Sequence, residues 1–219
     1  MIKRRRACAC KVKIGWGVIP ILVGCGVSLL TEYGRGQAEA LFCMVLASVC
    51  HEWGHFVMAR AVNVPLAECR LDLLGARLKP QDTMSYVQEW WLCAGGPLFN
   101  FLSVALLLPL WLSAARNVWA CPAWLVRQLG TFLVASLGLG VLNLMPIDSF
   151  DGGRMVRCAL SLFMEERTAH RVSTGASFVC LIGLWMLSVY VLLRVGRSLS
   201  MFVFSFTLLY RGLSEYSET

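Results

Sequence analysis

His51, Glu52 and His55 form the pattern H-E-x-x-H inside an apolar stretch of the chain. In an α-helix, residues four positions apart lie on one face, about one turn apart. Two imidazoles placed in this way can bind one zinc ion, and a glutamate beside the first can reach a water molecule on that metal. The pattern is typical of zinc metalloproteases, in which the glutamate is the general base.

A catalytic zinc site usually takes three protein ligands and leaves one position for water. The two histidines supply two ligands, so the third must come from elsewhere in the chain. Asp151 is favoured, because Gly152 and Gly153 let the backbone there come close to another helix. Asp148 is the alternative on chemical grounds. The remaining candidates are Glu89 and, further off, His170.

Asn143 stands at the end of an apolar stretch, shortly before Pro146, which is expected to stop the helix. Hydrolysis of a peptide bond places negative charge on the carbonyl oxygen, which needs the metal and a further hydrogen-bond donor. The Asn143 amide is a candidate donor, while Glu52 would take a proton from water and return it to the leaving amine. An amide at this position equally fits packing between helices.

The elements that must position these residues are apolar enough to lie in a membrane. Of the 219 residues, 58% are apolar and 15% are charged, where a soluble domain has about 45–50% and about 25%. The apolar residues form blocks between charged loops, which predicts an all-α polytopic membrane protein with about six transmembrane helices. The expected spans are 14–30, 39–60, 86–112, 123–145, 172–193 and 199–210.

Two segments between the expected spans are more polar. The one from Ala61 to Ser85 contains residues 71–78, which alternate in part and include a glycine. This predicts a small β-element of one or two short strands after the metal helix. The segment with charged residues from Arg157 to Arg171 is expected to be a loop.

Charge gives the expected orientation. Most of the 20 Lys and Arg residues fall on one side of the expected spans, beginning with a basic tail at 1–13. The positive-inside rule therefore predicts cytosolic termini and a metal site near the cytosolic end of the second span. The net charge of +7 is not taken to indicate nucleic-acid binding, because no motif for it is present. The ten cysteines form no C-x2-C pair and are expected to be buried thiols.

Three elements, in this order, resemble the site-2 protease family of intramembrane zinc metalloproteases. They are His51–His55, the stretch Ala94-Gly95-Gly96-Pro97…Asn100, and Asn143-x-x-Pro146-x-x-x-x-Asp151-Gly152. Small residues in the second element let helices approach closely, and its asparagine can hydrogen-bond across a helix interface. The match covers 39–155 and is most similar to the compact type of stage IV sporulation protein FB, here without that type's CBS domain.

The resemblance implies a role for each site residue. His51, His55 and Asp151 would hold one zinc ion per chain, Glu52 would be the catalytic base, and Asn143 would contact the substrate or the oxyanion. The short strands would line the site and pair with an unwound substrate.

The expected organisation is a single membrane-embedded protease domain at 14–210, with its core at 39–155 and short tails at 1–13 and 211–219. The resemblance implies substrates that are membrane proteins or membrane-associated peptides, cut within the lipid bilayer of a bacterial cell. In the sporulation branch the substrate is a pro-sigma factor, and an inhibitory membrane partner is a further expectation.

Two other functions remain open. The chain could be a catalytically silent homologue that binds or scaffolds membrane segments. It could also be a transporter that uses the same polar groups for the passage of an ion or a metal, although it lacks the internal repeat that many transporters show.

Overall fold

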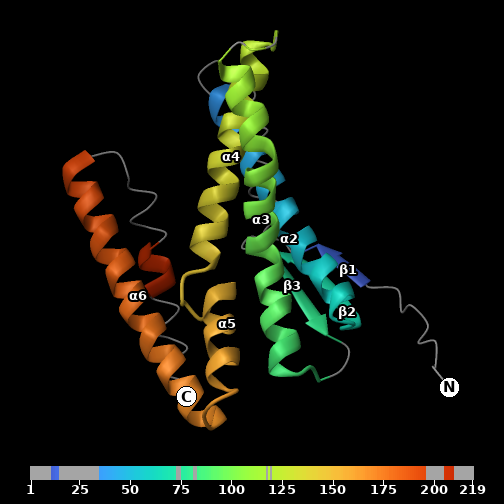
Figure 1. The fold of residues 1–219 in the computed structure, drawn as a ribbon. Coiled ribbons are helices and arrows are strands. Elements are labelled where there is room, and N and C mark those ends of the chain that lie inside the picture. Colours follow the sequence, from blue (N-terminus) through green and yellow to red (C-terminus); the bar gives the residue numbers. More distant parts are fainter. Residues whose placement is uncertain are drawn as a thin grey trace, which may run out of the picture. The chain divides into compact units, whose positions relative to one another are not determined.

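The structure is a computed structural model that describes residues 11–14, 35–72, 75–80, 83–116, 118, 120–195 and 205–209. The chain forms two compact units, Met1–Leu142 and Asn143–Thr219. In chain order, the elements in Figure 1 are β1 (Lys11–Ile14), α2 (Arg35–Ala61), β2 (Leu66–Asp72), β3 (Gly75–Pro80), α3 (Tyr86–Ala115), α4 (Ala123–Asn143), α5 (Asp151–Leu160) and α6 (Glu166–Val195).

Within the described part of the chain, four helices are long and apolar enough to cross a membrane, namely α2, α3, α4 and α6. They carry large exposed apolar side chains, such as Val134 (73% exposed) and Val179 (70%), and apolar surfaces of this kind are suited to lipid. The predicted helical, polytopic membrane fold is therefore confirmed for the second to fifth expected spans. The first expected span lies outside the described residues except for Ile14, and of the sixth only 205–209 is described, as helix.

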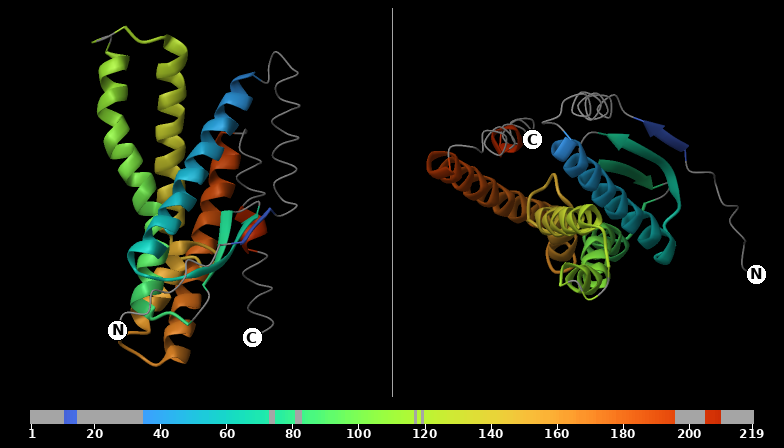
Figure 2. Two further views of the ribbon diagram at one scale, coloured as in Figure 1. Left: turned by 90° about the vertical axis from the view of Figure 1, so that its right-hand side faces the viewer. Right: turned by 90° about the horizontal axis from the view of Figure 1, so that it is seen from above.

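A three-stranded sheet in the order β1-β2-β3 belongs to the first unit. β2 and β3 form an antiparallel hairpin, while β1 pairs in parallel with β2 from Lys11↔Glu68 to Ile14↔Leu71. Figure 2 shows the sheet beside α2, and β3 contacts this helix. The strands predicted within 71–78 are present as parts of β2 and β3. The local pattern does not predict β1, because a parallel pair joins segments that are distant in sequence.

Two glycines meet where α2 and α3 lie side by side (Figures 1 and 2). A Cβ atom on Gly54 would collide with the carbonyl group of Gly95 and lie 2.7 Å from Cβ of Phe99. A Cβ atom on Gly95 would lie 2.7 Å from the carbonyl oxygen of Gly54 and 2.8 Å from Cβ of Met58. Small residues allow such close approach of helices in lipid. The backbones of α2 and α3 are therefore in contact at Gly54, the residue that precedes His55.

A capping box fixes the start of α3. The Ser85 hydroxyl accepts from the backbone amide of Gln88 at 3.2 Å, and the Gln88 side chain accepts from the backbone amide of Ser85 at 3.1 Å. The Gln88 side chain also donates to the carbonyl oxygen of Val62, just after α2, at 3.1 Å. The helix begins at Tyr86, as predicted, and these bonds set its register against α2.

In the second unit, α5 and α6 pack against each other. The expected charged loop before the fifth span is present only at 161–165. The rest of that expectation is wrong, because α5 occupies Asp151–Leu160 and α6 already begins at Glu166. Gly152, Gly153 and Cys158 of α5 are buried. A helix can bury some residues and expose charged ones, so charged residues in this segment did not exclude a helix.

Candidate metal centre

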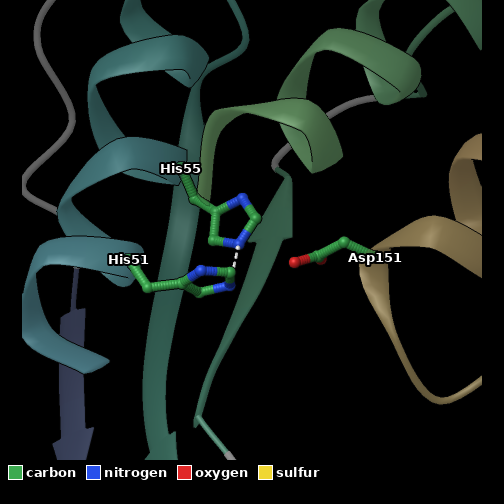
Figure 3. A group of neighbouring side chains, drawn as sticks. All are labelled: His51, His55 and Asp151. Carbon is green, nitrogen blue, oxygen red and sulfur yellow. Dashed lines mark hydrogen bonds between the residues drawn. The ribbon is translucent and has the colours of Figure 1, made fainter. Parts of the chain in front are cut away.

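The two histidines of the H-E-x-x-H pattern lie one turn apart on α2, with their rings close together (Figure 3). Both side chains are buried, with 5% of His51 and 7% of His55 exposed. Their Nε2 atoms are 3.2 Å apart, and the ring planes meet at 85°. Two tetrahedral ligands of one zinc ion at the usual Zn–N distance are separated by about 3.3 Å. The pair therefore fits a shared zinc ion.

α3 engages the other nitrogen of each ring. Nδ1 of His55 donates to the carbonyl oxygen of Leu92 at 2.7 Å. Nδ1 of His51 lies 3.3 Å from the side-chain amide nitrogen of Asn100, a residue that is fully buried. A backbone carbonyl such as that of Leu92 fixes the tautomer and the orientation of a metal-binding histidine. Both Nδ1 atoms thus face α3, while the two Nε2 atoms face each other.

Gly96 on α3 leaves the space that the two rings occupy. A Cβ atom at this position would lie 2.6 Å from both Cε1 and Nε2 of His51, and it would collide with Nε2 of His55. A side chain of any size therefore competes with the imidazoles for the same volume. The small-residue stretch of α3 therefore has two effects. Gly95 allows contact between the helices, and Gly96 leaves room for the two imidazole rings.

Glu52 follows His51 on α2, and its side chain leaves the helix about 100° further round. It is half-buried, between the buried His51 and Trp53, which is 59% exposed. The carboxylate oxygen Oε2 is buried, although the residue as a whole is only half-buried. A general base must come within hydrogen-bond reach of the water molecule that it deprotonates.

Asp151 belongs to the second unit, where it is half-buried and opens α5 (Figure 3). A carboxylate in the first turn of a helix is favoured by the helix dipole. The two following glycines lie against the preceding backbone. A Cβ atom on Gly152 would collide with the carbonyl group of Leu144, and one on Gly153 would collide with the carbonyl oxygen of Ile147. The two glycines thus let the start of α5 pack closely against the backbone of 144–147.

Asp148, the alternative third ligand, is bonded to α6. Its side-chain oxygen Oδ1 accepts a hydrogen bond from the Ser173 hydroxyl at 3.3 Å. Its backbone amide donates to the Ser177 hydroxyl at 3.0 Å. These contacts give Asp148 a structural role in anchoring the 144–150 segment to α6, which sequence analysis did not foresee.

The other sequence-derived candidates belong to three different helices. Asn143 is the half-buried last residue of α4, so the helix ends before Pro146 as expected. Glu89 is half-buried in the first turn of α3, and His170 is exposed near the start of α6. Within the first unit, the structure brings His51 and His55 together. The structure also places Asn100 beside His51. This contact could not be predicted from the sequence, because it depends on how α2 and α3 pack.

Comparisons with known proteins agree with this description. No protein-family model matches the chain. Stage IV sporulation protein FB of Bacillus subtilis (strain 168) is 25% identical over 166 residues, which cover 70% of this chain and 52% of that protein. The chain thus spans about half the length of this curated relative.

A solved structure shows the same fold. The Site-2 Protease from Methanocaldococcus jannaschii matches with a TM-score of 0.64 and 19% sequence identity, over 93% of this chain and 89% of that chain. The fold is therefore that of a site-2 protease, and the family resemblance predicted from the sequence is confirmed. With four apolar helices of sufficient length among the described residues, the chain is an integral membrane protein.

Proposed function

We propose that this chain, which has the fold of a site-2 protease, is an intramembrane zinc metalloendopeptidase. The observation that carries the proposal is the buried imidazole pair on α2, whose Nε2 atoms lie 3.2 Å apart. Ionisable groups at membrane depth are costly and usually functional. The likeness to the archaeal site-2 protease supports the same conclusion.

The proposed ligands of one zinc ion per chain are His51, His55 and Asp151, a donor set of two imidazole nitrogens and one carboxylate oxygen. Such a set leaves a position for water, as in other hydrolytic zinc sites. The choice of Asp151 is supported by the bonds that tie Asp148 to α6. When bound, zinc acts as a Lewis acid on the scissile carbonyl and lowers the pKa of water to about 7.

Glu52 is the proposed general base. Its carboxylate takes a proton from the attacking water and delivers it to the nitrogen of the scissile peptide bond. The water oxygen forms the new bond to the carbonyl carbon, the C–N bond breaks, and the products are a carboxylate and an amine. Asn143 is proposed to donate a hydrogen bond to the carbonyl oxygen, on which negative charge develops.

The proposed substrates are transmembrane segments or membrane-associated peptides, because the histidines lie in an apolar span. Lipid limits the entry of water and of soluble peptides, so a substrate would reach the site from the bilayer. The B. subtilis relative is named a sporulation protein, which supports a bacterial membrane as the biological setting. The proposed process there is the cleavage of a pro-sigma factor. An inhibitory membrane partner would then control the timing of cleavage.

The proposed orientation places both termini in the cytosol. Arg60 lies in the last turn of α2, just beyond the histidines, and positively charged residues favour the cytosolic side. The metal centre would then lie within the membrane, nearer the cytosol. Accessibility of single engineered cysteines to an impermeant reagent in intact cells would test this orientation.

A zinc measurement and a cleavage assay together test the function. The wild-type protein and Glu52→Gln would be purified in detergent, their zinc content measured, and each mixed with a model transmembrane substrate. We expect about one zinc ion per chain in both proteins, and cleavage by the wild type alone. The substitution keeps the side-chain size and removes the base.

Each other outcome contradicts a defined part of the proposal. Cleavage by Glu52→Gln at the wild-type rate would exclude Glu52 as the base. A wild-type protein without zinc would exclude the metal centre. Zinc in the wild-type protein without cleavage of any membrane substrate would favour the silent homologue.

A further inference from the structure

We infer that Asn100 is a positioning residue of the metal centre, which turns its side-chain oxygen Oδ1 toward Nδ1–H of His51. This inference rests on the proposed zinc function and adds a residue to it. Its consequence is that Asn100 acts through His51, by orienting the ring and fixing which nitrogen carries the proton. Both residues lie within one unit, His51 on α2 and Asn100 on α3.

The first observation is that the two ends of the Asn100 amide differ in their hydrogen bonding. Its nitrogen lies 3.3 Å from Nδ1 of His51, whereas its oxygen Oδ1 is buried and has no hydrogen-bond partner among the described residues. A buried acceptor without a donor is unfavourable, and buried polar groups in proteins are nearly always paired. The two ends of an amide have almost the same size and shape, so their assignment follows from the hydrogen-bond network.

The second observation is the chemistry of the imidazole. A histidine that binds a metal through Nε2 carries its proton on Nδ1, which is then a donor. The amide nitrogen of Asn100 is also a donor, so it cannot accept this proton. The amide oxygen can accept it. With zinc bound, the amide must therefore face His51 through Oδ1, an exchange of two atoms that needs no movement of either helix.

The third observation is the neighbouring histidine. Nδ1 of His55 already faces an acceptor, the carbonyl oxygen of Leu92, at 2.7 Å. Leu92 and Asn100 are about two turns apart on α3, and Gly96 between them leaves space for the rings. One face of α3 would thus give an acceptor to each Nδ1 atom, one from the backbone and one from a side chain. Both Nε2 atoms would then be available to the metal in the same way.

Zinc affinity in two variants at this position tests the inference. Asn100→Asp keeps an oxygen acceptor for Nδ1–H, whereas Asn100→Leu has a similar size and no acceptor. We expect Asn100→Leu to bind zinc roughly 10- to 100-fold more weakly, as is typical when an outer partner of a metal ligand is lost. Asn100→Asp should stay within about threefold of the wild type, because carboxylates are common partners of metal-binding histidines.

The readout is competition with a chelator of known zinc affinity, together with the visible spectrum of the cobalt-substituted protein. Size-exclusion chromatography in detergent establishes that each variant is folded. If Asn100→Leu does not fold, Asn100→Ala replaces it, because it also lacks an acceptor. Ser103→Ala is the matched control: it lies one turn further along α3, and its hydroxyl bonds to its own helix at Phe99, at 2.8 Å.

The pattern of the results separates the alternatives. A purely packing role predicts that the buried charge of Asn100→Asp is the most harmful change, and this result would overturn the inference. Equal zinc affinity in the wild type and Asn100→Leu would overturn it as well, while leaving the zinc function intact. A wild-type protein that binds no zinc would instead refute the proposed function itself.

Discussion

Replacing Gly96 with alanine would place a methyl group against the two imidazoles of the candidate metal centre. The new Cβ would lie 2.6 Å from Cε1 and Nε2 of His51 and would collide with Nε2 of His55. Non-bonded carbon atoms come to rest about 3.5 Å apart or further, so either the helix or the rings must move by about 1 Å. The helix is constrained, because α3 is already in backbone contact with α2 at Gly95. The rings are therefore expected to move.

The displacement of the rings sets the expected loss of zinc binding. Metal–ligand distances tolerate deviations of about 0.2 Å, far less than the required shift. Turning one imidazole away from its preferred rotamer costs about 0.5–1.5 kcal/mol, so two rings cost about 1–3 kcal/mol. This corresponds to roughly 5- to 150-fold weaker zinc binding, with the fold largely retained.

The assay is zinc competition in detergent, with thermal unfolding of the same samples to report on the fold. Gly138→Ala in α4 is the control, because a Cβ atom there meets nothing within 4 Å. This control should bind zinc like the wild type and unfold at the same or a higher temperature. Wild-type zinc affinity in Gly96→Ala would refute the idea that this glycine leaves space for the metal-binding rings.

Two further predictions concern the third ligand and the start of α3. Asp148→Asn keeps an acceptor for the Ser173 hydroxyl, so zinc content should be unchanged, whereas Asp151→Asn should remove zinc; the opposite result, measured by metal analysis, would make Asp148 the ligand. Ser85→Ala removes the cap of α3 and should lower the free energy of unfolding by about 1 kcal/mol. Zinc content should stay the same in this variant, and unchanged thermal stability would show that the cap is dispensable.

The small-residue stretch of α3 has a different role at each position. Gly95 permits contact with α2, Gly96 leaves room for the rings, and Asn100 lies against Nδ1 of His51. Seen as sequence alone, such a stretch indicates helix packing in lipid. Its direct contacts with the histidines link the packing of α2 on α3 to the geometry of the metal centre, so changes at this interface should alter zinc binding.

The sequence by itself determined the features that depend on local spacing and composition. The four-residue interval between His51 and His55 was enough to place both rings on one face of a helix, because the helical period is fixed. The long apolar blocks identified α2, α3, α4 and most of α6, because a membrane span needs a certain length of apolar chain. The order of the three motifs supported the family.

Only the tertiary structure determined the contacts between segments that are distant in the sequence. The pairing of β1 with β2 and the contacts of α3 with the histidine rings join residues far apart in the chain, so no local pattern specifies them. The start of α6 was not predicted, because a sequence with many charged residues is typical of a polar loop as well as of the exposed side of a helix. Asp148 and Asp151 are chemically alike in sequence, and the bonds from α6 give Asp148 structural partners that no local pattern specifies.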